Sequence, residues 1–234
     1  MKLLSQNAKM RRSSDGQYNI YNFTLPAYKP NAKFEVNNAP RFTCPQALNC
    51  IQGCYARQGA YLFSNVAKKH HANLDIALSP EFESVLQKDL DKAVKQSERK
   101  GQKCLIRIHD SGDFFGLDYT LTWFRVMRLN PNVQFYAYTK SVELFKDLRD
   151  HEDLNQPSNF SLIYSLGGKQ DSLINLETDR HSRVFESLDD LLDAGYVDAS
   201  HDDTVALGSN PKIGLVYHGG KKYSNTTWNK VKKD

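Results

Sequence analysis

Two strand-like runs separated by a helical pattern constrain this fold more than any other feature of the sequence. Residues 104–109 and 133–138 are apolar runs of strand length, rich in β-branched and aromatic side chains. Between them, over residues 117–129, apolar positions recur at helical spacing. A helix that connects two successive strands of one sheet requires them to pair in parallel, with a right-handed crossover. This order predicts an α/β protein built on a parallel sheet.

The rest of the chain extends the pattern over one domain. A length of 234 residues suits one domain with a large core, because α/β barrels commonly occupy about 200–250 residues. Residues 1–220 are therefore expected to form a single α/β domain with an irregular N-terminal segment and a sheet that is open or closed. Further strands are predicted at 18–25, 159–165 and 212–218, and further helices at 55–69, 79–101, 142–149 and 188–194.

A short basic tail follows this domain at residues 221–234. It contains five lysines and one aspartate, which accounts for the whole net charge of +4 and leaves the preceding residues neutral. A basic tail can bind nucleic acid, whereas a solvated terminus is the commoner reason for such a composition. Both interpretations stay open.

The sequence also bears on cellular location. The first residues lack the apolar stretch of a signal peptide, and no apolar run approaches the length of a membrane helix. We expect a cytoplasmic protein that does not contact a membrane. In that reducing compartment, clustered cysteines indicate metal binding or catalysis rather than disulfides.

Three of the four cysteines form such a cluster, Cys44, Cys50 and Cys54, with five and three intervening residues. Thiolates are soft ligands that suit iron–sulfur clusters and zinc. Three thiolates leave one ligand position unfilled. The spacing predicts either a cluster iron that is open to a small molecule or a zinc ion completed by histidine or water.

The fourth cysteine, Cys104, begins a predicted strand instead of following one. In parallel β/α folds the functional groups gather at the carboxyl ends of the strands. A strand of six residues separates Cys104 from that end by about 20 Å. We therefore expect Cys104 to pack in the core and not to bind metal.

Polar and small residues terminate three successive predicted strands. They are His109-Asp110-Ser111-Gly112-Asp113, Tyr138-Thr139-Lys140-Ser141 and Ser165-Leu166-Gly167-Gly168. One such end is an ordinary turn, but three of them aimed at the same edge suit a polar cofactor.

The order of these parts resembles the radical S-adenosylmethionine superfamily. That superfamily places three cysteines after its first strand, a glycine-rich acidic turn after the second and polar ends after the third and fourth. The motifs Cys-Tyr-Ala-Arg, Arg-Ile-His-Asp-Ser-Gly-Asp-Phe and Phe-Tyr-Ala-Tyr-Thr-Lys-Ser are similar to those of a bacteriophage family known as gene product 88. The resemblance extends over about residues 5–220.

This resemblance implies a partial, open TIM-type barrel that binds a 4Fe–4S cluster through Cys44, Cys50 and Cys54. It also implies that S-adenosylmethionine binds at the strand ends, in the host cytoplasm if a phage encodes the protein. The residues assigned to that cofactor are Tyr55, Ser111, Gly112, Asp113, Thr139 and Ser165. The cysteine spacing is longer than is usual in the superfamily, and Asp113 stands where a glutamate is usual.

Three functions compete on these observations. The first is a radical S-adenosylmethionine-type enzyme whose substrate and catalytic residues are unknown. The second is a non-catalytic protein, stabilised by zinc or an iron–sulfur centre, that acts on host nucleic acid or a host protein. The third is a metal-assisted nuclease or hydrolase that uses His109, Asp110 and Asp113.

Overall fold

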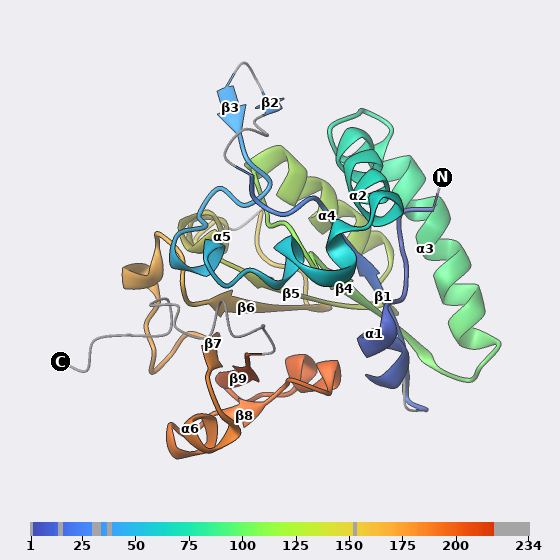
Figure 1. The fold of residues 1–234 in the computed structure, drawn as a ribbon. Coiled ribbons are helices and arrows are strands. Elements are labelled where there is room, and N and C mark those ends of the chain that lie inside the picture. The colour runs from blue at the N-terminus through green and yellow to red at the C-terminus, as the bar shows by residue number, and fades with distance from the viewer. Residues whose placement is uncertain (1, 14–15, 30–33, 37–38, 152–153, 218–234) are drawn as a thin grey trace.

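A seven-stranded parallel sheet organises the protein. The computed structural model describes residues 2–13, 16–29, 34–36, 39–151 and 154–217. The strand order is β1-β4-β5-β6-β7-β9-β8, and every neighbouring pair is parallel. The sheet curls into a half-barrel with helices on one side (Figure 1). Its strands are β1 (Tyr18–Phe23), β4 (Lys103–Ile108), β5 (Gln134–Thr139), β6 (Phe160–Ser165), β7 (His181–Phe185), β8 (Val197–Asp198) and β9 (Lys212–Val216).

The helices and turns connect these strands. The α-helices are α1 (Ala8–Ser13), α2 (Ser64–Ala77), α3 (Phe82–Glu98), α4 (Leu117–Leu129), α5 (Val142–Arg149) and α6 (Leu188–Asp193). The short 3-10 turns are η1 (Asn49–Ile51), η2 (Tyr55–Arg57), η3 (Gly59–Leu62), η4 (Asp171–Leu173) and η5 (Asp203–Leu207). A separate antiparallel pair consists of β2 (Phe34–Val36) and β3 (Ala39–Arg41).

The parallel α/β sheet predicted from the strand order is confirmed, and its open form is a half-barrel. Helices α4 and α5 have the bounds that their apolar spacing predicts. None of the helices in the described ranges is long and apolar enough to span a membrane. The basic tail at 221–234 lies outside the described residues, as does the last residue of the strand predicted at 212–218.

The larger core lies between the sheet and helices α3, α4 and α5. One face of α3 contributes Phe82, Leu86, Leu90 and Ala93, which recur every three or four residues. Trp123 of α4 is fully buried and packs edge-on against Phe23 of β1. These apolar stripes hold the helices on the convex face of the sheet, so the concave face remains available for other groups.

A smaller core covers part of the concave face. Met10 of α1 and Ala206 of η5 pack there against inward-facing residues of the strands. The strand residues are Ile20, Leu105, Tyr136, Ile163 and Ile213. The N-terminal helix and the turn η5 thus cover part of the concave face.

Two parts of the fold differ from the sequence prediction. The helix expected at 55–69 is two 3-10 turns followed by α2, because Gln58 and Phe63 have extended backbones and Gly59 is left-handed with φ 56°. Strands β7 and β8 were not predicted. β7 has the sequence His-Ser-Arg-Val-Phe, whose two basic residues mask its apolar alternation, and β8 has only two residues.

The glycine at 112 provides a test of how tightly the strand ends pack. Its φ is +89°, and an added Cβ would lie 2.6 Å from Cβ of Leu25. Gly112→Ala should therefore lower the free energy of unfolding by about 2 kcal/mol or more, through strain and overpacking.

The matched control is Gly116→Ala, where an added Cβ meets no atom within 4 Å and the backbone is extended. Its unfolding free energy should change by less than about 0.5 kcal/mol in urea titrations. Equal losses in the two variants would contradict the packing argument.

Candidate functional site at the strand ends

The carboxyl ends of β4, β5 and β6 are joined by direct side-chain contacts. Asp113, after β4, accepts hydrogen bonds from Thr139 Oγ1 at 2.6 Å and from the Lys140 backbone N–H at 2.8 Å, both at the end of β5. Lys140 Nζ in turn donates to Ser165 Oγ at 2.7 Å at the end of β6. The predicted strand-end residues therefore do lie together along one rim of the sheet.

Asp113 is buried and already has three donors. Its Oδ1 accepts from Thr139 and from the Phe114 N–H at 2.8 Å, and its Oδ2 accepts from Lys140. Burial raises the pKa of this carboxyl, and these hydrogen bonds oppose that rise. A carboxylate has about four acceptor positions, so one position on Oδ2 stays available for a further donor.

The other residues that we assigned to a cofactor differ in accessibility. Thr139 is fully buried, and its hydroxyl lies between Asp113 and the Ser141 N–H. The Ser111 hydroxyl is buried without a hydrogen-bond partner. Ser165 is half-buried and bound to Lys140. Gly112 is required by its contact with Leu25 and by its backbone conformation, so packing of the chain itself explains this glycine.

Tyr55 combines an anchored hydroxyl with an open ring. Its hydroxyl donates to the backbone oxygen of Asp110, and its ring lies edge-on to Tyr61. Burial of the hydroxyl and the nearby Asp110 carboxylate raise its pKa. The residue is nevertheless 48% exposed, so part of it can contact a ligand.

The three clustered cysteines are half-buried beside this rim. Burial raises the pKa of Cys44, and the Asp113 carboxylate and the other two thiols raise it further. Burial also raises the pKa of Cys54. These electrostatic effects require the three side chains to lie near one another and near Asp113.

Backbone contacts fix the cysteine segment to the end of β6. The Cys50 N–H donates to the Gly167 oxygen at 3.1 Å, and Ala47 forms an isolated bridge with Gly168. An added Cβ on Gly168 would lie 3.0 Å from the Gln46 oxygen, so this close approach favours a glycine.

The thiols do not form a finished ligand set. Within the described part of the chain, no three His, Cys, Asp or Glu side chains are grouped so as to hold a metal ion. Metal binding through Cys44, Cys50 and Cys54 therefore requires their side chains to move closer together. Cys104 lies at the start of β4, buried in the helix-side core, and the prediction that it binds no metal stays untested.

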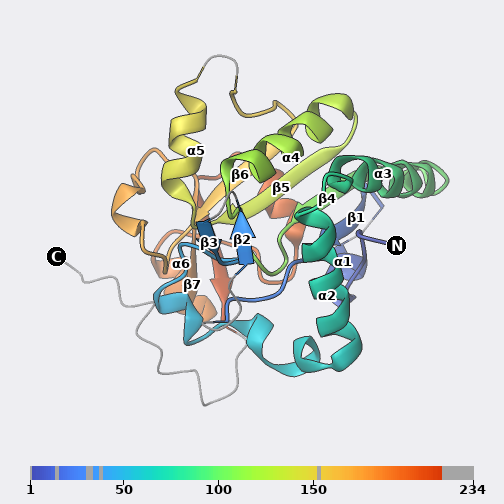
Figure 2. The same ribbon diagram turned by 90° about the horizontal axis from the view of Figure 1, so that it is seen from above.

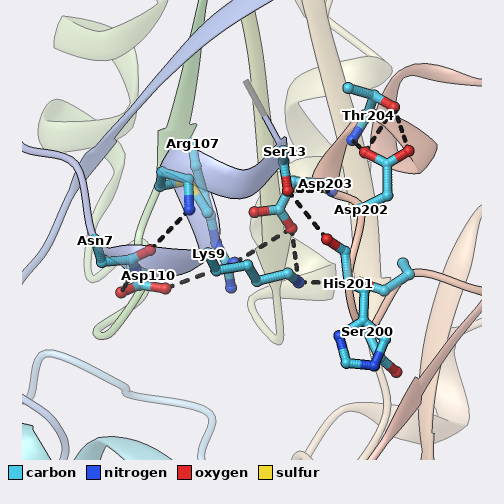
Figure 3. Close-up of polar contacts among 12 residues, drawn as sticks. Asn7, Lys9, Ser13, Arg107, Asp110, Ser200, His201, Asp202, Asp203 and Thr204 are labelled. Carbon is cyan, nitrogen blue, oxygen red and sulfur yellow. Dashed lines mark hydrogen bonds and ion pairs between the residues drawn. The ribbon is translucent and has the colours of Figure 1, made fainter. Parts of the chain in front are cut away.

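A buried charge network lies below the rim, and the sequence analysis missed it (Figure 3). Arg107 of β4 faces the concave side, with Nη1 3.5 Å from Asp110 Oδ1 and 3.5 Å from Asp203 Oδ1. Lys9 of α1 is 2.9 Å from the same Asp203 oxygen. The signal was present in the sequence, because Arg107 is a charged residue in the middle of an apolar strand.

Asp110 connects this network to the cysteine segment. Its Oδ2 accepts hydrogen bonds from Asn7 at 3.0 Å, from Asn22 at 3.3 Å and from the Tyr61 hydroxyl. Its backbone oxygen accepts from Tyr55. The turns η2 and η3, which follow Cys54, are thereby attached to the sheet through one residue.

His109 does not join Asp110 and Asp113 in a hydrolytic site. Its backbone is left-handed, with φ 63°, and this conformation places its ring among Phe114 and Tyr119 on the helix side. Nε2 lies 2.8 Å from the Tyr119 hydroxyl. Burial lowers the pKa of His109 to about 3. This placement gives no support to the metal-assisted hydrolase that uses His109.

The burial of His109 predicts a pH effect on stability. The unfolded chain protonates this histidine below about pH 6.5, whereas the folded chain resists protonation down to about pH 3. When the pH is lowered from 7 to 5, the free energy of unfolding of the wild-type protein should fall by about 2 kcal/mol more than that of the His109→Asn variant. Urea titrations at the two pH values measure both changes. Asparagine is chosen because it tolerates a left-handed backbone. An identical pH dependence in the two proteins would show that His109 titrates freely in the folded state.

Comparison with known proteins identifies relatives of the chain. Residues 1–230 match the family described as Gene product 88. The chain is 31% identical over 143 residues to the Gene 88 protein of Mycobacterium phage L5 and 29% identical over 143 residues to that of Mycobacterium phage D29. Each match covers 57% of this chain and 59% of the relative. No solved structure matches significantly. The chain therefore belongs to the Gene product 88 family, whose relatives include these phage proteins.

Proposed function

We propose that this protein binds a 4Fe–4S cluster through Cys44, Cys50 and Cys54 and S-adenosylmethionine at the adjacent strand ends, as an enzyme of the radical S-adenosylmethionine type. The observation that carries the proposal is that backbone hydrogen bonds hold the cysteine segment against the rim, from the Asp113 N–H to the Thr43 oxygen at 2.6 Å and from the Cys50 N–H to the Gly167 oxygen at 3.1 Å. Three soft ligands beside a polar rim at the carboxyl ends of parallel strands are the arrangement that such cofactors need. The reaction and its substrate are left open.

The donor set supports a sulfur-bound centre. All three cysteines are free thiols and half-buried, and binding one centre requires their side chains to move closer together. Contacts from Cys50 and Ala47 to the glycines after β6 hold the intervening loop against the rim. When bound, an iron–sulfur cluster supplies an electron to the cofactor.

The rim itself supports binding of a polar cofactor that carries an ammonium group. Asp113 keeps one acceptor position on Oδ2, and the neighbouring Ser111 hydroxyl has no partner. Tyr55 is held at its hydroxyl end and is 48% exposed, and an exposed tyrosine ring suits stacking on a planar base. These residues would bind and orient the cofactor.

Substitution of the cysteines tests the metal centre. Cys44→Ala, Cys50→Ala and Cys54→Ala should each abolish bound iron after anaerobic reconstitution, because a site with three thiolates cannot lose one. Cys104→Ala is the matched control and should retain its iron, because that thiol lies in the helix-side core. Iron loss in the Cys104 variant equal to that in the others would contradict the assignment. A colourless wild-type protein with one zinc per chain would favour the zinc-stabilised alternative.

Substitution of Asp113 tests the cofactor. Asp113→Asn removes the charge that would face the ammonium group, so it should weaken S-adenosylmethionine binding by about 1.5–3 kcal/mol in anaerobic calorimetric titrations. Thr139→Val is the control: it removes one donor to the same carboxylate but leaves the charge. Its effect on affinity should be smaller.

Both variants need a parallel urea titration, because Asp113 also holds β5 to the loop after β4. The affinity comparison applies to protein that remains folded. If the iron-loaded wild-type protein binds no cofactor at millimolar concentration, the enzyme proposal fails.

A further inference from the structure

The segment that contains the cysteines has an unusual charge composition. From residue 36 to residue 74 the sequence contains no aspartate or glutamate, but it contains two arginines and two lysines. The net charge of the whole chain conceals this asymmetry, because acidic residues elsewhere balance it. A long stretch with cations and no carboxylates creates a positive surface wherever its side chains are exposed.

Several of these cations are exposed and unpaired. Arg57 and Lys68 are exposed, and Lys69 is half-buried close enough to Lys2 for the two charges to repel. In the ranges that the structure describes, no carboxylate forms an ion pair with Arg57, Lys68 or Lys69, although the Asp89 carboxylate acts to raise the pKa of Lys69. The guanidinium of Arg57 is oriented by one hydrogen bond to the Ile51 oxygen.

Exposed apolar side chains lie on the same segment. Of the twelve exposed large hydrophobic residues in the described ranges, four belong to residues 48–63. They are Leu48 at 49%, Tyr55 at 48%, Leu62 at 67% and Phe63 at 62% exposure. Tyr55 and Phe63 are the two aromatic members of the whole set. Leaving adjacent Leu62 and Phe63 in water is unfavourable unless another molecule covers them.

The segment also runs along one side of the molecule. Viewed from above, the cyan stretch that leads into α2 runs along the side of the molecule opposite α4 and α5 (Figure 2). Its residues are placed by η2 and η3, which Tyr55 and Tyr61 anchor to Asp110. The turns η2 and η3, which carry Tyr55 and Arg57 and lead to Phe63, are thus fixed to the sheet.

We propose that residues 48–71 form a docking surface for single-stranded nucleic acid. Proteins that bind single strands combine cations along the phosphate backbone with exposed aromatic rings on which bases stack. Arg57, Lys68 and Lys69 supply the charge, and Tyr55 and Phe63 supply the rings. An acidic protein partner would use the charge but would leave the stacking rings without a matching group. This surface differs from the basic tail. It shares Tyr55 with the proposed cofactor site, whereas Arg57, Phe63, Lys68 and Lys69 are not assigned to that site.

Fluorescence anisotropy with a labelled single-stranded oligothymidine tests the proposal on the full-length protein. Phe63→Ala should weaken binding about 5- to 100-fold, the range for loss of one stacked base, with the salt dependence unchanged. Arg57→Gln should weaken binding and also reduce the slope of log K against log salt by about 0.7, the value for one lost phosphate contact on a single strand. The two variants thus separate the stacking contribution from the charge contribution.

Matched controls lie on other surfaces. Leu129→Ala on α4 removes an apolar side chain as exposed as Leu62, and Arg99→Gln at the end of α3 removes an exposed cation. Both should bind as the wild type does. Lys230, Lys232 and Lys233 can also be changed to glutamine together. In that protein, Phe63→Ala and Arg57→Gln should weaken binding by the same factors as in the wild type.

Three outcomes would overturn the proposal. The first is binding that depends only on the tail lysines. The second is a duplex of equal length that binds as tightly as the single strand, because stacked bases in a duplex cannot use the rings. The third is complete displacement of the oligothymidine by polyglutamate. That result would show that the surface binds any polyanion and suits an acidic protein.

Discussion

The concave side of this protein depends on contacts among four charges, those of the buried Arg107, Asp110 and Asp203 and the half-buried Lys9. They come from α1, from β4 and its loop, and from η5. Two cations and two carboxylates offset each other, so the group as a whole is neutral. Removing one member would leave a buried charge uncompensated, which typically costs about 3–5 kcal/mol. The packing of the first helix and the last turn on the concave face is therefore coupled to one charge network.

The network also sets the position of the candidate site. Asp110 belongs to the charge network and also binds the cysteine segment, because it accepts hydrogen bonds from Tyr55 and Tyr61. On the other side, Gly167 and Gly168 hold the same segment to the end of β6. The loop that carries the thiols is therefore attached to the sheet at both ends. These protein contacts position the loop independently of a bound metal. The left-handed conformation of His109 makes this possible, because it turns the following Asp110 toward the concave side.

Much of the fold was predictable from the sequence, because apolar spacing and strand order are local signals that the tertiary structure preserves. The bounds of α4 and α5 follow from such spacing. β7 was not predictable in this way, because its Arg183 and His181 interrupt the apolar pattern and its pairing depends on distant strands. The convergence of Asp113, Thr139 and Ser165 followed from the rule that parallel strands end at one edge. Sequence reasoning did not predict that Asp113 would already be occupied by three donors, because those donors come from residues 114, 139 and 140 only after folding.

The metal content of anaerobically reconstituted wild-type protein tests the central claim most directly. We expect iron and acid-labile sulfide in equal amounts, together with a change in the electron paramagnetic resonance spectrum of the reduced protein when S-adenosylmethionine is added. Such a change requires the cofactor to reach the cluster, so it tests the three thiols and the polar rim together. A protein that takes up no iron, or an iron-loaded protein whose spectrum does not respond to the cofactor, would contradict the account.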